Sequence, residues 1–299
     1  MSRRFRAEAA LLFNTLVWGS TFVLVKHALL GVSPLLFLAL RFSIATAGLL
    51  AVLGRAAFSG VGRRSRLPHK DLAAGVLCGT FLFAGYLLQT LGLSLTSAPK
   101  SAFLTGLTSV MVPFLAALVY KVRPQVSEVV GVLMATAGLA LMTLKASAGG
   151  VNPGDLLTLL CAAGFAAHIV TLGHFSERMC FEILSIAQVG AAAVWSIGLL
   201  RVIETPRIEW RPDVVATLLI TGLLATAMAF TVQAWAMQYT TSTRTAVIFM
   251  FEPVVAWATS FWLAGEGLSA RAAAGAALIL FGILTVEVKP LRQRKHPST

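Results

Sequence analysis

Two charged residues lie inside stretches of sequence that are otherwise apolar and long enough to cross a membrane. Glu252 lies in the stretch 243–264, eight residues after Arg244, and Arg41 lies in the stretch 34–54. A charge at the centre of a bilayer costs roughly 2.5–3.5 kcal/mol on insertion scales, so each of these residues needs a partner or a function. Glu252 is consistent with a site for a proton or a substrate amine, and equally with a clamp on a neighbouring helix. Arg41 is consistent with pairing to a buried carboxylate or to backbone carbonyls.

Polar side chains also recur at helical spacing along several apolar stretches. In the first stretch Asn14, Trp18 and Thr21 share one face of a helix. Such stripes turn away from lipid, toward neighbouring helices or a cavity. Interhelical hydrogen bonding explains any single Ser or Thr, whereas the stripes together predict a shared cavity. The residues predicted to bind substrate or to line the transport path are Asn14, Trp18, Thr21, Tyr86, Gln89, Thr105, His168, Gln233, Trp235 and Glu252.

Two further cations stand at the starts of apolar stretches. Lys100 and Arg244 lie where the positive end of a helix dipole does not favour a cation. Together with Arg41 they are interpreted as gate or structural charges, and snorkelling of Lys100 and Arg244 to the membrane interface is the alternative. Trp18, Tyr86 and Trp235 would give a pocket aromatic walls, which suits amphipathic ligands.

Metal and cofactor chemistry is not predicted. His168 and His174 are six residues apart and point to different sides of a helix, and the three cysteines have no metal-binding spacing. We therefore predict no metal, no cofactor and no catalytic residue. His168 fits a hydrogen-bonding role in a cavity.

The elements that must position these residues are membrane helices. The chain is 57% hydrophobic and only 12% charged, about half the charged share of a soluble domain. A helix needs roughly 20 mostly apolar residues to span a bilayer. The predicted spans are 8–28, 34–54, 71–94, 98–120, 127–144, 154–174, 182–203, 213–237, 243–264 and 269–288. The predicted fold is an all-α integral membrane protein with ten transmembrane helices.

The basic residues set an orientation. The net charge is +12, but Lys and Arg lie in termini and short loops, which argues against nucleic acid as a partner. With the N-terminus inside, 16 of them fall on the cytoplasmic side and 7 on the other, and Arg41 lies within a span. The positive-inside rule therefore predicts cytoplasmic termini and a multi-pass protein of a bacterial inner membrane.

The chain also repeats itself. A shift of 144 positions brings Thr96 onto Thr240 and Gly131 onto Gly275 without a gap. Five helices per unit is an odd number, so the second unit would enter the bilayer inverted, with a binding site between the halves. The predicted domains are the repeats 1–146 and 150–290, followed by a basic cytoplasmic tail, 291–299.

Two details qualify this symmetry. Pro253 lies one turn earlier in its helix than Pro113 does, which predicts helix breaks at different heights in the two halves, unless the shift is neutral drift. The fifth and tenth spans carry almost no polar residue at their centres, and they are interpreted as packing elements, with a subunit interface of a homodimer as a further role.

Several motifs resemble the drug/metabolite transporter superfamily, in particular its EamA type. They are residues 16–22 (LVWGSTF), 40–42 (LRF), 102–105 (AFLT) with Pro113, 243–246 (TRTA), Glu252-Pro253, Gly265-Glu266, and Gly275 with Gly282. The resemblance covers nearly the whole chain and implies ten helices, a central cavity and export of small metabolites, often amino acids or their relatives. The first half departs from it, because no acid in the fourth span matches Glu252 and Val122 stands where Glu266 has its counterpart.

The function predicted is a secondary transporter, an exporter of small amphipathic metabolites that works by alternating access and that a bound proton could drive. No nucleotide-binding motif is present. An integral-membrane enzyme acting on lipid is the alternative class, but the sequence lacks a recognisable catalytic cluster. A channel is the third, and it lacks an evident selectivity-filter segment.

Overall fold

The computed structural model describes residues 2–58, 68–96, 98–121, 124–143, 152–264 and 270–287. These residues form α-helices and one π-helix. In chain order they are α1 (Arg3–Ala28), α2 (Pro34–Phe58), α3 (Pro68–Leu95), α4 (Ala98–Gly106), α5 (Thr108–Tyr120), α6 (Val126–Thr143), α7 (Pro153–Ser176), α8 (Phe181–Ile203), α9 (Pro212–Leu219), η1 (Ile220–Met228), α10 (Ala229–Ala236), α11 (Ser242–Phe249), α12 (Glu252–Ala264) and α13 (Ala270–Glu287). Val122, Glu266 and the tail 291–299 lie outside the described residues.

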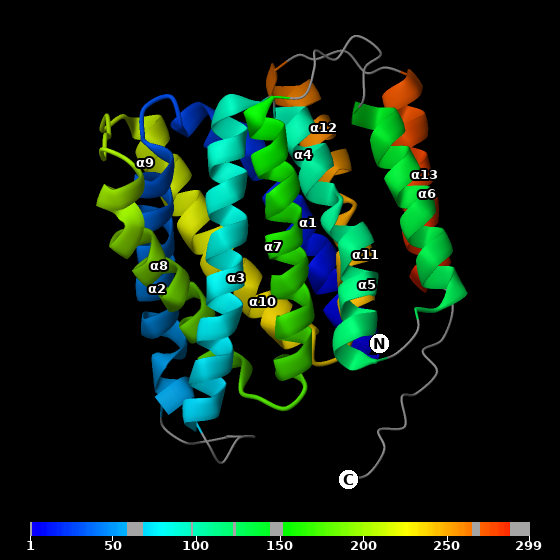
Figure 1. The fold of residues 1–299 in the computed structure, drawn as a ribbon, viewed down its shortest axis with the longest axis horizontal. Coiled ribbons are helices and arrows are strands. Elements are labelled where there is room, and N and C mark those ends of the chain that lie inside the picture. The colour runs from blue at the N-terminus through cyan, green and yellow to red at the C-terminus, as the bar shows by residue number, and fades with distance from the viewer. Residues whose placement is uncertain are drawn as a thin grey trace.

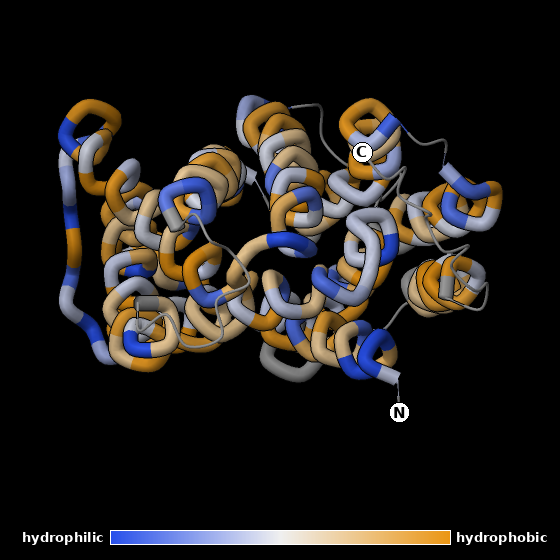
Figure 2. Tube along the Cα trace, turned by 90° about the horizontal axis from the view of Figure 1, so that it is seen from below, coloured by the Kyte–Doolittle hydropathy of each residue, from blue (hydrophilic) through white to orange (hydrophobic). Residues whose placement is uncertain are grey.

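Ten membrane-crossing segments result when α4 and α5, α9 to α10, and α11 and α12 are each joined end to end (Figure 1). Seven continuous spans in the described part are long and apolar enough to cross a membrane, and α6 and α13 contain shorter apolar stretches. The prediction of an all-helical membrane protein is confirmed. Figure 2, which looks along the helices, shows them standing side by side in one bundle.

Local sequence explains where many of these helices begin. α2, α3, α7 and α9 each start at a proline, whose fixed φ and missing N–H suit the first helical position. α7 adds a capping box, in which the Asn152 side chain accepts from the Asp155 N–H and the Asp155 carboxylate accepts from the Asn152 N–H.

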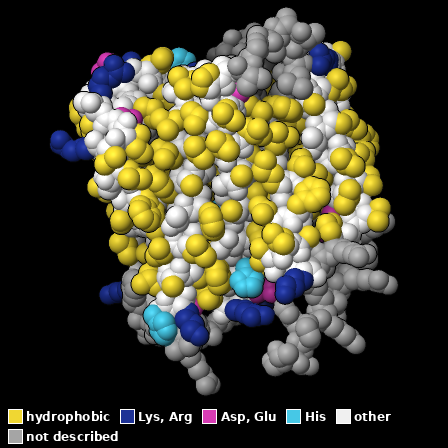
Figure 3. All heavy atoms as spheres, in the orientation of Figure 1, with side chains coloured by type: hydrophobic (Ala, Val, Ile, Leu, Met, Phe, Trp, Pro, Cys, Tyr) yellow, Lys and Arg dark blue, Asp and Glu magenta, His cyan; other side chains and the backbone are white. Residues whose placement is uncertain are grey.

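The outer surface is that of a protein in lipid. On the face shown in Figure 3, hydrophobic side chains cover the middle, while Lys and Arg gather near the upper and lower ends. Val52, Leu118 and Phe281 are among the large apolar side chains that are mostly exposed. A soluble monomer rarely exposes so broad an apolar surface, whereas a bilayer covers it.

The fourth and ninth segments both break in the middle, and the sequence-based expectation about the heights of these breaks is wrong. α4 ends at Gly106 and α11 at Phe249, and the breaks at Leu107 and Phe251 are 144 positions apart. The hydrogen bonds that close them also correspond. Leu107 N–H donates to Leu104 O at 3.2 Å, as Phe251 N–H does to Ile248 O at 3.0 Å.

The prolines do not set the heights of these breaks. Pro113 lies inside α5, where the helix continues, and Pro253 is the second residue of α12. A proline is tolerated inside a membrane helix where neighbouring helices and Ser or Thr side chains satisfy the freed backbone carbonyl, so a proline does not by itself mark a break.

The eighth segment departs from α geometry. Residues 220–228 form a π-helix of nine residues, whereas the positions 144 earlier, 76–84, lie in the uninterrupted α3. π-Helical segments are rare and leave backbone carbonyls and side chains out of the usual register. This segment packs against α2, and two of its residues accept hydrogen bonds from Arg41 on α2.

The fifth and tenth segments, α6 and α13, pack against each other through glycines at the right-hand edge of the bundle (Figure 1). A Cβ on Gly138 would lie 2.5 Å from the carbonyl oxygen of Gly275, and one on Gly131 would lie 2.7 Å from that of Gly282. Any side chain at these positions would force the two backbones apart.

Candidate functional site

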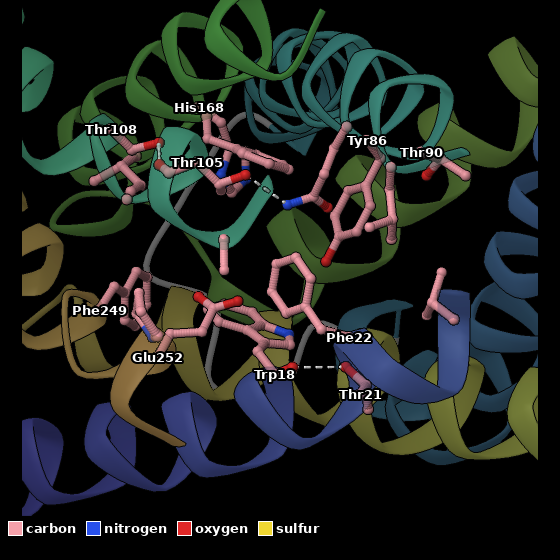
Figure 4. A pocket seen from close by; sticks show the side chains of 18 of the residues that line it. Trp18, Thr21, Phe22, Tyr86, Thr90, Thr105, Thr108, His168, Phe249 and Glu252 are labelled. Atoms are coloured by element: carbon pink, nitrogen blue, oxygen red, sulfur yellow. Dashed lines mark hydrogen bonds between the residues drawn. The ribbon is translucent and has the colours of Figure 1, made fainter. Parts of the chain in front are cut away.

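A cavity lies inside the bundle between helices of both halves (Figure 4). Its volume is about 100 Å³, counted as the space open to the centre of a water molecule. Its lining comes from α1, α2, α3, α4, α5, α7, α10, α11 and α12, and it is largely apolar and aromatic with a few polar groups. That composition is typical of small-molecule sites.

Eight of the ten predicted site residues line this cavity. They are Trp18, Thr21, Tyr86, Gln89, Thr105, His168, Gln233 and Glu252. Asn14 instead lies buried between helices, where its side-chain amide donates to Ala229 O at 2.7 Å. Trp235 packs in a separate cluster against Tyr239. Both lie on the predicted helices. Asn14 is one helical turn before Trp18 on the same face, and Trp235 is two residues after Gln233 on a different face.

Glu252 is the acid of the cavity and the first residue of α12, directly after the helix break. Its carboxylate points into the cavity beside Trp18 (Figure 4). Among the residues that the structure describes, none gives this carboxylate a hydrogen bond or an ion pair. The backbone here is held closely, because a Cβ on Gly19 would lie 2.7 Å from Glu252 O. The backbone of Glu252 is therefore held against α1, and the carboxylate is available to a ligand.

Arg41 reaches the cavity from α2 and is only 4% exposed. Its Nε donates to Thr226 Oγ1 at 2.7 Å, and its Nη2 donates to Tyr86 Oη at 3.1 Å and to Ala225 O at 3.4 Å. The sequence predicted a buried carboxylate or backbone carbonyls as the partners of Arg41, and the structure shows one backbone carbonyl, that of Ala225. No carboxylate in the described part of the chain pairs with it.

The π-helix supplies two of these acceptors, Thr226 Oγ1 and Ala225 O. Thr226 Oγ1 itself donates to Thr221 O, five residues earlier, at 2.7 Å. Ala225 O, which accepts from Arg41, also accepts from Trp18 Nε1 at 2.7 Å. The widened turn thus joins the cavity faces of α1 and α2, and no sequence signal had marked it.

Aromatic rings form the apolar walls. Trp18 lies 4.9 Å from Phe249 and 5.4 Å from Phe230, measured between ring centroids. Tyr86 contacts Phe165 edge-on at 5.2 Å. Edge-to-face packing of this kind holds each ring in a fixed orientation.

Other polar residues of the cavity hydrogen-bond to neighbouring side chains. Gln89 Nε2 donates to Thr105 Oγ1 at 3.2 Å, and His168 Nε2 lies 2.8 Å from Gln188 Oε1. His174, by contrast, stacks on Tyr120. The two histidines therefore have separate surroundings.

Two charged clusters lie away from the cavity, toward the two ends of the bundle. Arg244 is 3% exposed and lies 3.5 Å from Glu8 Oε1, and Thr240 Oγ1 donates to the same oxygen at 3.3 Å. Lys100 lies in α4, and its side chain is outside the described structure.

At the other end, Lys26 Nζ donates to Leu93 O at 2.5 Å and to Thr96 O at 2.9 Å, and Thr96 Oγ1 donates to Asp155 Oδ1 at 2.8 Å. Sequence reasoning missed Glu8, Lys26 and Asp155. The match between Thr96 and Thr240 was the signal that could have led to both acids.

The fold and this cavity define the class: a multi-pass helical membrane protein with a central amphipathic site. Comparison with known proteins then gives the family. The EamA-like transporter family matches twice, over residues 6–144 and 152–287, and the chain belongs to it. The resemblance inferred from the sequence motifs is confirmed.

Individual relatives agree with this assignment. An uncharacterized transporter of Archaeoglobus fulgidus is 34% identical over 96% of this chain and 87% of its own length. The uncharacterized transporter YoaV of Bacillus subtilis is 24% identical over 90% of this chain and 92% of its own. A solved crystal structure of a protein with 21% identity superimposes with a TM-score of 0.78, covering 95% of this chain and 98% of that one, and it shows the shared fold.

Proposed function

We propose that this protein is a secondary transporter that exports small amphipathic metabolites, amino acids and related compounds among them, by alternating access through the central cavity. One observation carries the proposal: helices of both halves enclose an aromatic-walled cavity that holds the carboxylate of Glu252 without a partner among the described residues. A transporter needs a site between its halves that can open to either side.

Internal symmetry supports alternating access. The paired breaks at Leu107 and Phe251 lie at equivalent positions, and Gly131 packs on Gly282 as Gly138 packs on Gly275. Each glycine contact becomes the other when the chain is shifted by 144 positions. A two-fold axis lying across the helices would produce such an exchange, so we propose two inverted five-helix units, 1–146 and 150–290.

Glu252 is the residue proposed to couple binding to movement. A lone carboxylate in a bilayer is costly, and a proton or a substrate ammonium group removes that cost. Either would leave when the cavity opens to the opposite side. The excess of Lys and Arg at the end that carries the N-terminus supports placing that end in the cytoplasm.

The test is flux into liposomes containing the purified protein, measured across pH and normalised to folded protein. Saturable flux of a metabolite is the expected result. Glu252→Gln keeps the shape of the side chain, and it should reduce flux at least ~10-fold or flatten its pH dependence.

The matched control is Glu209→Gln, which removes an exposed acid outside the cavity and should leave flux unchanged. Full specific activity and an unchanged pH profile in Glu252→Gln would remove this residue from the mechanism. If Glu252 is only a structural clamp, the yield of folded protein should fall and flux should fall in proportion. Conversion of lipid, or single-channel current in place of saturable flux, would contradict the proposed class.

A further inference from the structure

We infer that Arg41 is the residue that binds the anionic group of the substrate, and that with Glu252 it selects ligands carrying a carboxylate and an ammonium group together. The inference rests on the proposed function and assigns to Arg41 a role in specificity. The sequence alone had favoured a structural role for this residue.

The guanidinium group is held in place with one edge free. Nε and Nη2 are bonded to Thr226, Tyr86 and Ala225, and the guanidinium carbon lies 4.5 Å from the centroid of the Tyr86 ring. For Nη1 the structure shows no partner among the described residues. A planar donor fixed on one edge and free on another is prepared to bind a carboxylate, because little side-chain entropy is lost on binding.

The charge of Arg41 is solvated but not balanced. Its partners are two hydroxyls and a carbonyl, which are dipoles, and in the described part of the chain no acid forms an ion pair with it. A purely structural arginine inside a membrane protein normally pairs with an acid or with several carbonyls. Glu252 shows the reverse situation, a carboxylate for which the described residues supply no cation. These two residues line the same cavity, yet they form no ion pair with each other.

The cavity therefore contains one positive and one negative side chain that do not pair with each other. A ligand with an anionic and a cationic group balances both, and the aromatic walls formed by Trp18, Phe230 and Phe249 accept its apolar part. A ligand with only one charged group leaves a buried charge unpaired, and that is costly in a low-dielectric site. Discrimination should consequently depend on both charged groups.

The first experiment needs no variant. Binding of L-phenylalanine, L-phenylalanine amide and 3-phenylpropionate to the purified protein in detergent is measured by titration calorimetry. The amide lacks the carboxylate and the propionate lacks the amine, while the ring is shared. L-Phenylalanine should bind about 10- to 100-fold more tightly than either analogue, as expected for a lost charge-assisted hydrogen bond. Equal affinity for L-phenylalanine and its amide, or no binding of any of the three, would overturn the inference.

The variants then assign the two groups. Arg41→Gln should lower the affinity for L-phenylalanine and 3-phenylpropionate about 10-fold or more while sparing the amide, and Glu252→Gln should do the opposite. Arg201→Gln removes an exposed arginine near the end of α8 and should change none of the three affinities. A structural role for Arg41 predicts equal loss for all three probes in Arg41→Gln, which contradicts the inference.

Arg41→Lys keeps the charge and serves if Arg41→Gln does not fold. It should weaken binding of the two carboxylates because an ammonium group lacks the planar fork. Affinities for all three probes that match wild type would contradict the inference. Saturable flux of other solutes, with no discrimination by carboxylate, would overturn this inference and leave the proposed function standing. Absence of saturable flux for every solute tested would overturn the proposed function itself.

Discussion

The two ends of the bundle use the same hydrogen bond in different electrostatic settings. Thr96 follows α3 and donates to Asp155 near the start of α7, and Thr240 follows α10 and donates to Glu8 near the start of α1. These threonines are 144 positions apart in the sequence. In each case a hydroxyl after the third helix of one half reaches an acid in the first helix of the other half.

The difference lies in what balances the acid. Glu8 pairs with Arg244 on α11 and with Arg4 on its own helix, so a cation holds α1 to α11. Asp155 instead accepts from the backbone N–H of Asn152, and the nearby Lys26 bonds to the carbonyls that end α3. An ion pair between helices contributes to one end, and a helix cap contributes to the other. Removing one partner of the buried ion pair should therefore cost more stability than removing one hydrogen bond at the cap.

The largest effect is expected from Glu8→Gln. It leaves Arg244, which is 3% exposed, without this carboxylate, and should lower the free energy of unfolding by about 2–4 kcal/mol. Equilibrium unfolding in mixed detergent micelles measures this change. Glu8→Gln/Arg244→Met removes both charges and should recover most of the loss. Arg4→Gln breaks only the pair within α1 and should cost less than about 1 kcal/mol. A double variant as unstable as Glu8→Gln would show that the ion pair is not the cause.

A smaller effect is expected at the opposite end from Asp155→Asn. The substitution keeps the shape of the capping residue but removes its charge at a helix N-terminus, and should cost about 1–2 kcal/mol in the same unfolding assay. Asp213→Asn is the matched control, since Asp213 also lies in the first turn of a helix but is exposed and paired with Arg211. A loss at Asp155 no larger than the loss at Asp213 would contradict the stabilising role of the buried carboxylate at this helix start.

The smallest and most direct test compares Thr96→Val with Thr240→Val. Both changes preserve side-chain shape and remove one hydroxyl. Thr96 makes a 2.8 Å bond to the buried carboxylate of Asp155, so about 1 kcal/mol is expected there. Thr240 makes a 3.3 Å bond to an acid already paired with arginine, so less than about 0.5 kcal/mol is expected. Equal losses would show that the two ends are equivalent in energy despite their different charges.

The sequence predicted the positions of the helices well, because apolar length and the cost of an unbonded backbone in lipid leave few choices. Eight predicted site residues line the cavity for a similar reason: polar groups avoid lipid, so the polar face of each helix turns inward. Asn14 shows the limit of that reasoning. A buried amide that bonds to the Ala229 carbonyl has the same sequence signature as one that faces a cavity.

Other features depend on contacts between distant segments and left no local trace. The π-helix at 220–228 exists where Arg41 and Trp18 bond to its carbonyl and hydroxyl groups, 184 to 207 residues away in sequence. Pro113 is a local signal that misled the prediction. A proline inside a membrane helix indicated a break at its own position, but the break lies six residues earlier, at Leu107.

The glycine contact between α6 and α13 has a consequence for biosynthesis. Gly138 and Gly275 touch in the finished protein, yet 137 residues of chain separate them. At roughly 5–20 residues per second, the ribosome takes on the order of ten seconds to make that intervening chain. During this interval α6 must wait in the membrane with its small-residue face against lipid or against another protein, since its own partner does not yet exist. Closure of this edge of the bundle is therefore a late event of synthesis, and α13 is the segment that completes it.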